Sequence, residues 1–181
     1  KKRYMDSSSV QSLWNPVVPV RKRIQPNQKK AGLRICGDYS VTINSQLETH
    51  RYPMPLPEDL MRKLGGSFCF SKIDLADAYL QIKLAPESQR RLALSTHKGV
   101  LLQTRLPFGI TSAPGYFQEI MDKLTCDLPG VAVYLDDILV SGTTADEHLR
   151  NLRNLFQRLQ ERGLKCNQRK CVFARLSVEY L

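Results

Sequence analysis

The stretch that decides the fold is VAVYLDDILV at residues 131–140. Two apolar runs of β type, residues 131–135 and 138–140, are interrupted only by Asp136 and Asp137. Buried carboxylates without partners are costly, and they are neutralised or bound to cations. A polar turn with both acids in water is the alternative. Because favoured two-residue turns carry Gly after Asn or Asp, an Asp-Asp turn is strained, which favours a metal site.

A further acid supports the metal-site interpretation. Residues 67–73 form a buried-strand candidate that ends at Asp74, and Asp77 follows soon after. Two-metal phosphoryl transfer needs carboxylates that hold ions about 3.5–4 Å apart. Hard oxygen ligands of this kind suit Mg²⁺. The sequence therefore predicts one carboxylate cluster, provided that Asp74 and the hairpin are neighbours in the fold.

The rest of the chain predicts an α+β domain with a mainly antiparallel sheet. Further strands are expected at residues 17–20, 33–39 and 80–84, with a pair of strands inside 92–106. Residues 21–30 are read as a loop. Helices are expected at 57–64, from Pro114 onward, and after the capping box at 144–147, the last ending at Gly163. The predicted core face of the first helix is Leu60, Met61 and Leu64, and that of the second is Phe117, Ile120, Met121 and Leu124. On the third helix Leu149, Leu152, Phe156 and Leu159 are expected to face the core, and Arg150, Arg153 and Arg158 to face away from it.

Composition limits the classes of partner. The 181 residues are 42% apolar and 24% charged, which suits a folded domain. The net charge of +10 favours polyanionic partners, because Lys and Arg near phosphates release condensed counterions. No apolar run reaches the ~20 residues of a membrane-spanning helix. The five cysteines lack a disulfide or zinc spacing, and no signal-peptide pattern opens the chain, so we expect reduced thiols in an intracellular protein.

Several motifs, in order, resemble those of reverse transcriptases, in particular those of gypsy-type LTR retrotransposons. YLDD at 134–137 resembles the Tyr-x-Asp-Asp signature, and KIDLADAY at 72–79 resembles the motif of the first catalytic aspartate. LPFGITSAP at 106–114, running on to Phe117 and Gln118, resembles the motif that contacts template and nucleotide. Matches in the same order follow at LRICGDY (33–39), RYPMP (51–55), NQRKCVF (167–173) and VEYL (178–181). Ser40 departs from the pattern, which usually has Arg near that position.

The resemblance implies a right-hand polymerase fold over residues 15–181, after a polar N-terminal segment, 1–14. Fingers are expected mainly at 15–66 and 80–110, and a palm of mainly antiparallel sheet packed on helices mainly at 67–79 and 111–181. We expect a piece of a longer polyprotein that stops before the primer-gripping hairpin is complete. Thumb, ribonuclease H and integrase domains are then expected in the parent protein.

The resemblance also implies the roles of individual residues. Asp74, Asp136 and Asp137 are implied as a catalytic triad that binds two Mg²⁺ ions, or Mn²⁺ as a substitute, with the carbonyl of Leu75 as a further ligand. Tyr79 is implied to lie beneath the sugar and exclude a 2′-hydroxyl; a core aromatic is the alternative.

The remaining implied contacts are with the nucleotide. The triphosphate is implied to bind the backbone N–H groups of Asp77 and Ala78 and the side chain of Arg34, and the base and sugar to lie near Phe108 and Gly109. Lys170 is implied as the proton donor to pyrophosphate. A fingers lysine on the triphosphate is left open among Lys22, Lys29 and Lys30.

The implied activity is RNA-directed DNA synthesis, in which dNTPs are added to a primer 3′-hydroxyl on an RNA or DNA template. The main alternative is an inactive or co-opted retroelement fragment that binds nucleic acid without polymerising. A two-metal nuclease is disfavoured by Tyr79 and the LPFG segment. A basic domain with acidic turns is the remaining alternative. The expected location is a cytoplasmic particle or the nucleus, with no membrane partner.

Overall fold

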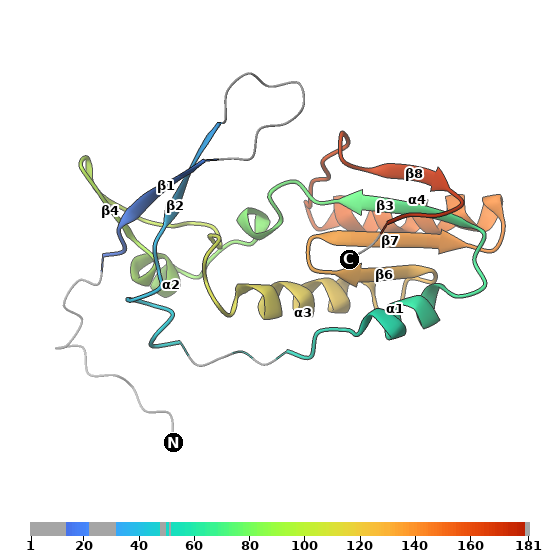
Figure 1. Ribbon diagram of the computed structural model, residues 1–181, viewed down its shortest axis with the longest axis horizontal. Helices are drawn as coiled ribbons and strands as arrows, with labels where there is room; N and C mark the ends of the chain where they lie inside the picture. The colour runs from blue at the N-terminus through green and yellow to red at the C-terminus, as the bar shows by residue number, and fades with distance from the viewer. Residues whose placement is uncertain (1–13, 22–31, 48–49, 51, 180–181) are drawn as a thin grey trace. The chain divides into compact units, whose positions relative to one another are not determined.

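The computed structural model describes residues 14–21, 32–47, 50 and 52–179 (Figure 1). The chain divides into two compact units. The first takes residues 1–49 and 82–113, and the second takes residues 50–81 and 114–181. Within the described residues, no helix has the length and apolar character needed to cross a membrane. All five cysteines are free, as expected.

The first unit holds two antiparallel strand pairs and a short helix. Strand β1 (Val17–Arg21) pairs with β2 (Leu33–Gly37), and β4 (Leu94–Thr96) pairs with β5 (Gly99–Leu101). Asn15 is fully buried, and its Nδ2 donates to the carbonyl oxygens of Ala93 and Arg91 at 2.9 and 3.2 Å. This side chain therefore ties the start of β1 to the segment before β4. Helix α2 (Pro86–Arg91) was not predicted, because it has no buried residue and thus no apolar periodicity.

The strand expected at residues 80–84 is wrong only at its start. Residues 80–81 belong to the 3₁₀ helix η1 (Ala78–Gln81), whereas Lys83 forms an antiparallel bridge with Arg105. Asp77 has a positive φ of 46°, and the N–H of Leu80 donates to the Asp77 carbonyl at 2.8 Å. A left-handed residue turns the backbone out of the extended direction, so the hydrogen bonds become local. The alternation of polar and apolar residues therefore misled the strand assignment.

The second unit is built on a four-stranded antiparallel sheet in the order β6-β7-β3-β8. Its strands are β6 (Val131–Tyr134), β7 (Asp137–Gly142), β3 (Cys69–Asp74) and β8 (Val172–Arg175). The mainly antiparallel sheet expected from the sequence is confirmed. Strand β8 is an edge strand with exposed residues, so it carries no buried apolar signal.

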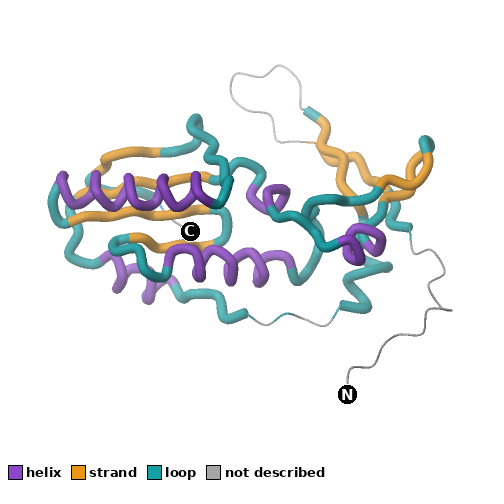
Figure 2. The backbone as a smooth tube through the Cα atoms, turned by 180° about the vertical axis from the view of Figure 1, so that it is seen from behind, coloured by secondary structure: helices purple, strands orange, loops and turns teal. Residues whose placement is uncertain are grey.

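The two faces of this sheet carry different helices, because side chains alternate along each strand. Helix α4 (Ala145–Glu161) covers one face: it lies behind the sheet in Figure 1 and in front of it in Figure 2. Helix α1 (Pro57–Leu64) packs on the other face, where Leu60 and Leu64 meet Ala132 and Leu139. Helix α1 lies within the range 15–66 that was expected mainly in the fingers, and it packs on this sheet.

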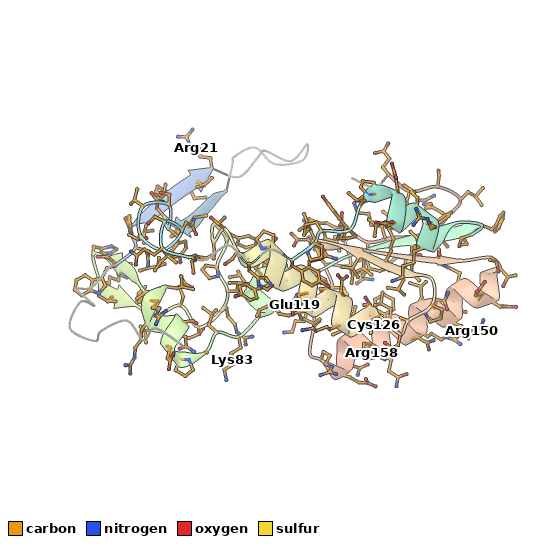
Figure 3. All side chains as sticks on the ribbon, turned by 90° about the horizontal axis from the view of Figure 1, so that it is seen from below. Arg21, Lys83, Glu119, Cys126, Arg150 and Arg158 are labelled. Carbon is orange, nitrogen blue, oxygen red and sulfur yellow. The ribbon has the colours of Figure 1, made fainter. Side chains whose placement is uncertain are left out.

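The predicted core face of α4 needs correction. Its buried side chains are His148, Asn151, Leu152, Leu155 and Leu159, while Leu149 and Phe156 are 47% and 36% exposed. The core face was predicted at the wrong positions because two of its buried residues, His148 and Asn151, are polar. Arg158, labelled in Figure 3, was expected to face away, yet it donates two bonds to the Asp127 carboxylate at 2.8 and 2.9 Å.

Helices α1 and α3 (Ala113–Thr125) show the same kind of error on a smaller scale. Met61 and Ile120, both predicted as core, are 56% and 37% exposed. On α3 the buried side chains include Gln118, a polar residue that was not among the predicted core positions. In each helix the remaining predicted core positions are buried.

The corrected α4 stripe leads to a stability prediction. Leu155 is completely buried against the sheet, so Leu155→Ala should lower the free energy of unfolding by about 2–5 kcal/mol. Leu149→Ala, on the same helix, should cost less than about 1 kcal/mol because Leu149 is half exposed. Urea unfolding of both variants measures the difference. Equal losses would contradict the assigned core face.

Buried His148 leads to a pH prediction. Ser71 accepts the N–H of Ala174 at 3.0 Å, and its hydroxyl is hydrogen-bonded to Nε2 of His148 at 2.8 Å. The Nδ1 atom is buried and without a hydrogen-bond partner, and burial lowers the pKa of His148. The native state therefore holds this imidazole neutral.

Because the folded pKa lies below the unfolded value of about 6.5, its contribution to stability is complete above pH 6.5. That contribution is lost as the pH falls through the folded pKa, by at most about 1.4 kcal/mol per pH unit. Urea unfolding of wild type and His148→Gln at pH 7.5 and 5.5 tests this. A smaller acid loss is expected in the variant, and identical losses would exclude His148 as the source.

Candidate active site

The hairpin between β6 and β7 carries the two adjacent acids. Tyr134 pairs with Asp137, so the two-residue turn consists of Leu135 and Asp136. The sequence argument placed Asp136 and Asp137 at the centre of the turn, and this is wrong by one residue. The strained residue is Leu135, with a φ of 52°, a region that costs a side chain about 1–2 kcal/mol. Asp137 is then the first residue of β7.

Strand register brings Asp74 to the hairpin. In the β3–β7 pairing Asp74 lies directly opposite Asp137, and Lys72 lies opposite Leu139. Like charges directly across a strand pair are destabilising. Two lysines offset them: Lys72 Nζ is 2.7 Å from Asp137 Oδ2, and Lys170 Nζ is 3.5 Å from Asp74 Oδ2. The strand ending at Asp74 and the acidic hairpin are therefore neighbours in the fold, which the sequence-based prediction had to assume.

Asp136 has a different environment. Its Oδ1 is buried and has no hydrogen-bond partner within the part of the chain that the structure describes. Burial, together with the charges of Asp137 and Asp74, raises the pKa of its carboxyl, while Lys170 lowers it. A buried carboxylate oxygen without a hydrogen bond is costly to keep.

These side chains line one pocket of about 580 Å³. Tyr79, from η1, lines it too, and its ring meets Phe117 edge-on with centroids 5.3 Å apart. Burial and the charge of Asp136 raise the pKa of the Tyr79 hydroxyl. The full lining is Lys72, Asp74, Tyr79, Tyr134, Leu135, Asp136, Asp137 and Glu179.

The residues present fit a hard divalent cation in kind. Carboxylate oxygens are the ligands that Mg²⁺ prefers, and the unpartnered Asp136 Oδ1 is the observation that fits a cation. Among the described residues, no three acidic, His or Cys side chains are gathered closely enough to hold one ion as they stand. Binding would therefore draw Asp74 and Asp137 away from their lysines.

Three other predicted residues of this unit, Leu75, Asp77 and Ala78, are close in sequence to residues that line the pocket. The N–H of Leu75 donates to the Asp136 carbonyl at 3.4 Å, which joins the two acidic segments. Asp77 is exposed and Ala78 is buried, and they stand at the start of η1. The first N–H groups of a helix have no partner inside it, and the implied contact of these two with the triphosphate stays a prediction.

The remaining predicted residues belong to the first unit or lie outside the described part. Gly109 has a φ of 94°, and a Cβ there would meet nothing nearer than 3.6 Å. The left-handed backbone conformation favours glycine at this position, and the implied contact of Gly109 with base and sugar stays a prediction. Phe108 precedes it. Arg34 lies in β2, and its side chain is outside the described residues, as are Lys22, Lys29 and Lys30.

Sequence reasoning assigned no role to three residues of this site. Lys72 was quoted only as part of a motif, as was Glu179, which lines the pocket from the VEYL segment. Gln118 donates to the Val133 carbonyl and accepts the N–H of Leu135, at 2.9 and 2.8 Å. Only the placement of Lys72 two residues before Asp74, on the same strand face, could have suggested its contact.

The fold and the site together define a polymerase palm: an antiparallel sheet with three carboxylates gathered at the end of β3 and at the β6–β7 hairpin. Residues 24–181 match the family described as reverse transcriptase (RNA-dependent DNA polymerase). The chain belongs to the reverse transcriptase family.

Relatives agree with this assignment. The uncharacterized protein K02A2.6 of Caenorhabditis elegans is 39% identical over 92% of this chain. The transposon Tf2-3 polyprotein of Schizosaccharomyces pombe is 32% identical over 85% of it. The chain spans 13% and 12% of the lengths of these two relatives.

Solved structures agree as well. The foamy viral protease-reverse transcriptase in complex with double-stranded DNA is similar at a TM-score of 0.80 and 27% identity, over 93% of this chain and 28% of that one. The same viral enzyme in complex with an RNA/DNA hybrid gives a TM-score of 0.79 over 93% of this chain and 22% of that one. The predicted resemblance to fingers and palm is confirmed.

Proposed function

We propose that this chain carries the polymerase centre of an LTR retroelement and extends a DNA primer on an RNA or DNA template. The observation that supports the proposal most strongly is the register of β3 and β7, which places Asp74 directly opposite Asp137. Asp136, whose Oδ1 is buried without a hydrogen bond to the described residues, immediately precedes Asp137 in the chain. The relatives include a transposon polyprotein, and the similar viral enzymes are bound to DNA and to an RNA/DNA hybrid.

In this proposal Asp74, Asp136 and Asp137 hold two Mg²⁺ ions, with the Leu75 carbonyl as a further ligand. When bound, such ions activate the primer hydroxyl and neutralise charge on the triphosphate. Lys72 and Lys170 serve as counter-charges to the carboxylates before the ions bind. Released Lys170 is then placed to donate a proton toward pyrophosphate.

The remaining residues orient the nucleotide. Tyr79 presents its ring to the pocket and excludes a 2′-hydroxyl by contact. The N–H groups of Asp77 and Ala78 bind the triphosphate. From the first unit, Arg34 is proposed on the phosphates, and Phe108 and Gly109 near the base and sugar. Catalysis by such a site comes mainly from positioning and charge neutralisation.

The proposed partners are primer–template, dNTPs and the thumb, ribonuclease H and integrase domains of a parent polyprotein. The net charge of +10 makes binding of primer–template strongly salt-dependent. The proposed location is a cytoplasmic particle or the nucleus.

An end-labelled DNA primer on a homopolymer RNA template tests the proposal. The chain, and a longer version that continues past residue 181, are incubated with dNTP and Mg²⁺. Longer products are expected, and a chelator should prevent them. Shortened primer would indicate the two-metal nuclease instead. An unchanged but bound primer, with both versions, would replace the proposal by a nucleic-acid-binding fragment.

A further inference from the structure

Helix α3 buries a polar residue next to the acidic hairpin. Gln118 has no exposed surface and lies between the equally buried Phe117 and, one turn on, Met121. A buried carboxamide is costly unless its donors and acceptor are satisfied. The partners of Gln118 therefore decide what it does.

Two of those partners are backbone groups of the hairpin. Its Nε2 donates to the Val133 carbonyl at 2.9 Å, and its Oε1 accepts the N–H of Leu135 at 2.8 Å. Strand β6 is at the edge of the sheet, so this row of backbone groups has no neighbouring strand. Gln118 satisfies the two groups that a further strand would have bound.

The third partner fixes which end of the carboxamide faces Leu135. Nε2 also donates to Asp122 Oδ1 at 3.0 Å, and the hydroxyl of Tyr52 donates to the other oxygen of Asp122 at 2.9 Å. An ionised carboxylate only accepts hydrogen bonds, so it requires the NH₂ end of Gln118. The carbonyl end must then face Leu135. The other acid on α3, Glu119 (labelled in Figure 3), contacts a different partner: its Oε2 lies 2.8 Å from Nε2 of His50.

The residue held in this way is the strained one. Leu135 has a φ of 52°, and it directly precedes Asp136 in the two-residue turn. A non-glycine residue stays in the left-handed region only when its surroundings hold it there. Release of Leu135 would rotate the peptide that leads into Asp136 and redirect that carboxylate.

We propose that Gln118 is a positioning residue: by clamping the Leu135 amide it fixes the direction in which Asp136 enters the pocket. Asp122 and Tyr52 set the orientation of the clamp. The inference rests on the proposed function of Asp136, but the clamp itself can be measured without it.

The test uses this chain and two matched variants. Gln118→Met keeps the length of the side chain and removes both hairpin bonds. Gln157→Met makes the same change at an exposed position of α4, where Nε2 of Gln157 donates to Oε1 of Glu161 at 3.1 Å. For each protein we measure the thermal midpoint, the hydrogen-exchange rate of the Leu135 amide, Mn²⁺ binding, and kcat and KM for one nucleotide addition.

In wild type the Leu135 amide should exchange about tenfold to a hundredfold more slowly than an unprotected turn amide. Folded Gln118→Met should lose this protection. Its kcat should fall by about tenfold to a hundredfold, as expected for a misplaced catalytic group, with KM for the dNTP unchanged. Gln157→Met should match wild type in every measurement.

A fast-exchanging Leu135 amide in wild type would overturn the clamp, even if Gln118→Met failed to fold. A folded Gln118→Met that lost protection but kept kcat within about twofold would overturn the positioning role. If wild type added no nucleotide at all, the proposed function would fail instead. Retained Mn²⁺ affinity in a variant without protection would then still reject Gln118 as the residue that positions Asp136.

Discussion

Asp136→Asn is expected to lower nucleotide incorporation by about a thousandfold, equivalent to about 4 kcal/mol of transition-state stabilisation. The substitution removes the charge of the carboxylate whose Oδ1 is buried without a hydrogen-bond partner among the described residues and which we propose as a metal ligand. Folding should not suffer. Burial and the charges of Asp137 and Asp74 already disfavour the ionised form, as its raised pKa shows, so the thermal midpoint should stay or rise.

Asp146→Asn is the matched control. Asp146 is exposed in the first turn of α4, where loss of its charge costs about 0.3–1 kcal/mol through the helix dipole. Its incorporation rate should equal that of wild type. Single-nucleotide incorporation with excess primer–template measures both variants. An Asp136→Asn protein that retained a tenth of wild-type activity would contradict the assigned role.

Tyr79→Ala is expected to raise the incorporation of ribonucleotides relative to deoxynucleotides by about a hundredfold. The ring is held edge-on against Phe117 with centroids 5.3 Å apart, so it presents a fixed surface to the pocket. Discrimination by contact needs such a surface, because a flexible one would yield to the extra hydroxyl. Alanine removes it and opens the space that a 2′-hydroxyl requires.

The control for Tyr79 is Tyr79→Phe, which keeps the ring and removes the hydroxyl. It should discriminate as well as wild type if the ring alone excludes the 2′-hydroxyl. The measurement is the ratio of kcat/KM for a dNTP and the matching rNTP in each protein. Unchanged ratios in Tyr79→Ala would contradict nucleotide selection by Tyr79 and favour the alternative, a core aromatic.

Segments with one dominant local signal were predictable from the sequence. Helix α1 begins at Pro57 and ends before two glycines, as expected, and the capping box of α4 is formed by Thr144, whose hydroxyl accepts the N–H of Glu147. The two apolar runs around the acids became β6 and β7. In all of these cases, local propensity and tertiary packing favour the same structure.

Where the sequence misled, a tertiary contact had replaced a local rule. His148 and Asn151 take core positions on α4 because the sheet supplies partners: Ser71 for the first and the Ser141 carbonyl for the second. Gln118 does the same on α3. No periodicity of apolar residues reveals such positions, because the compensating hydrogen bonds come from residues distant in the chain.

The same distinction between local signals and tertiary contacts applies to the candidate site. The three aspartates could be identified by their motifs, but the pairing of Asp74 with Asp137 depends on strand register, which is set by the whole sheet. The position of strain also depended on register. A two-residue turn closed by Tyr134 and Asp137 moves the positive φ from the acids to Leu135.

The most direct test of the account is Mn²⁺ binding, followed by electron paramagnetic resonance in the presence of dNTP and primer–template. The account predicts that wild type and Asp146→Asn bind Mn²⁺ alike, and that Asp136→Asn binds it at least about tenfold more weakly. Equal affinity in Asp136→Asn and wild type would contradict the claim that the carboxylates of β3 and the β6–β7 hairpin form one metal site.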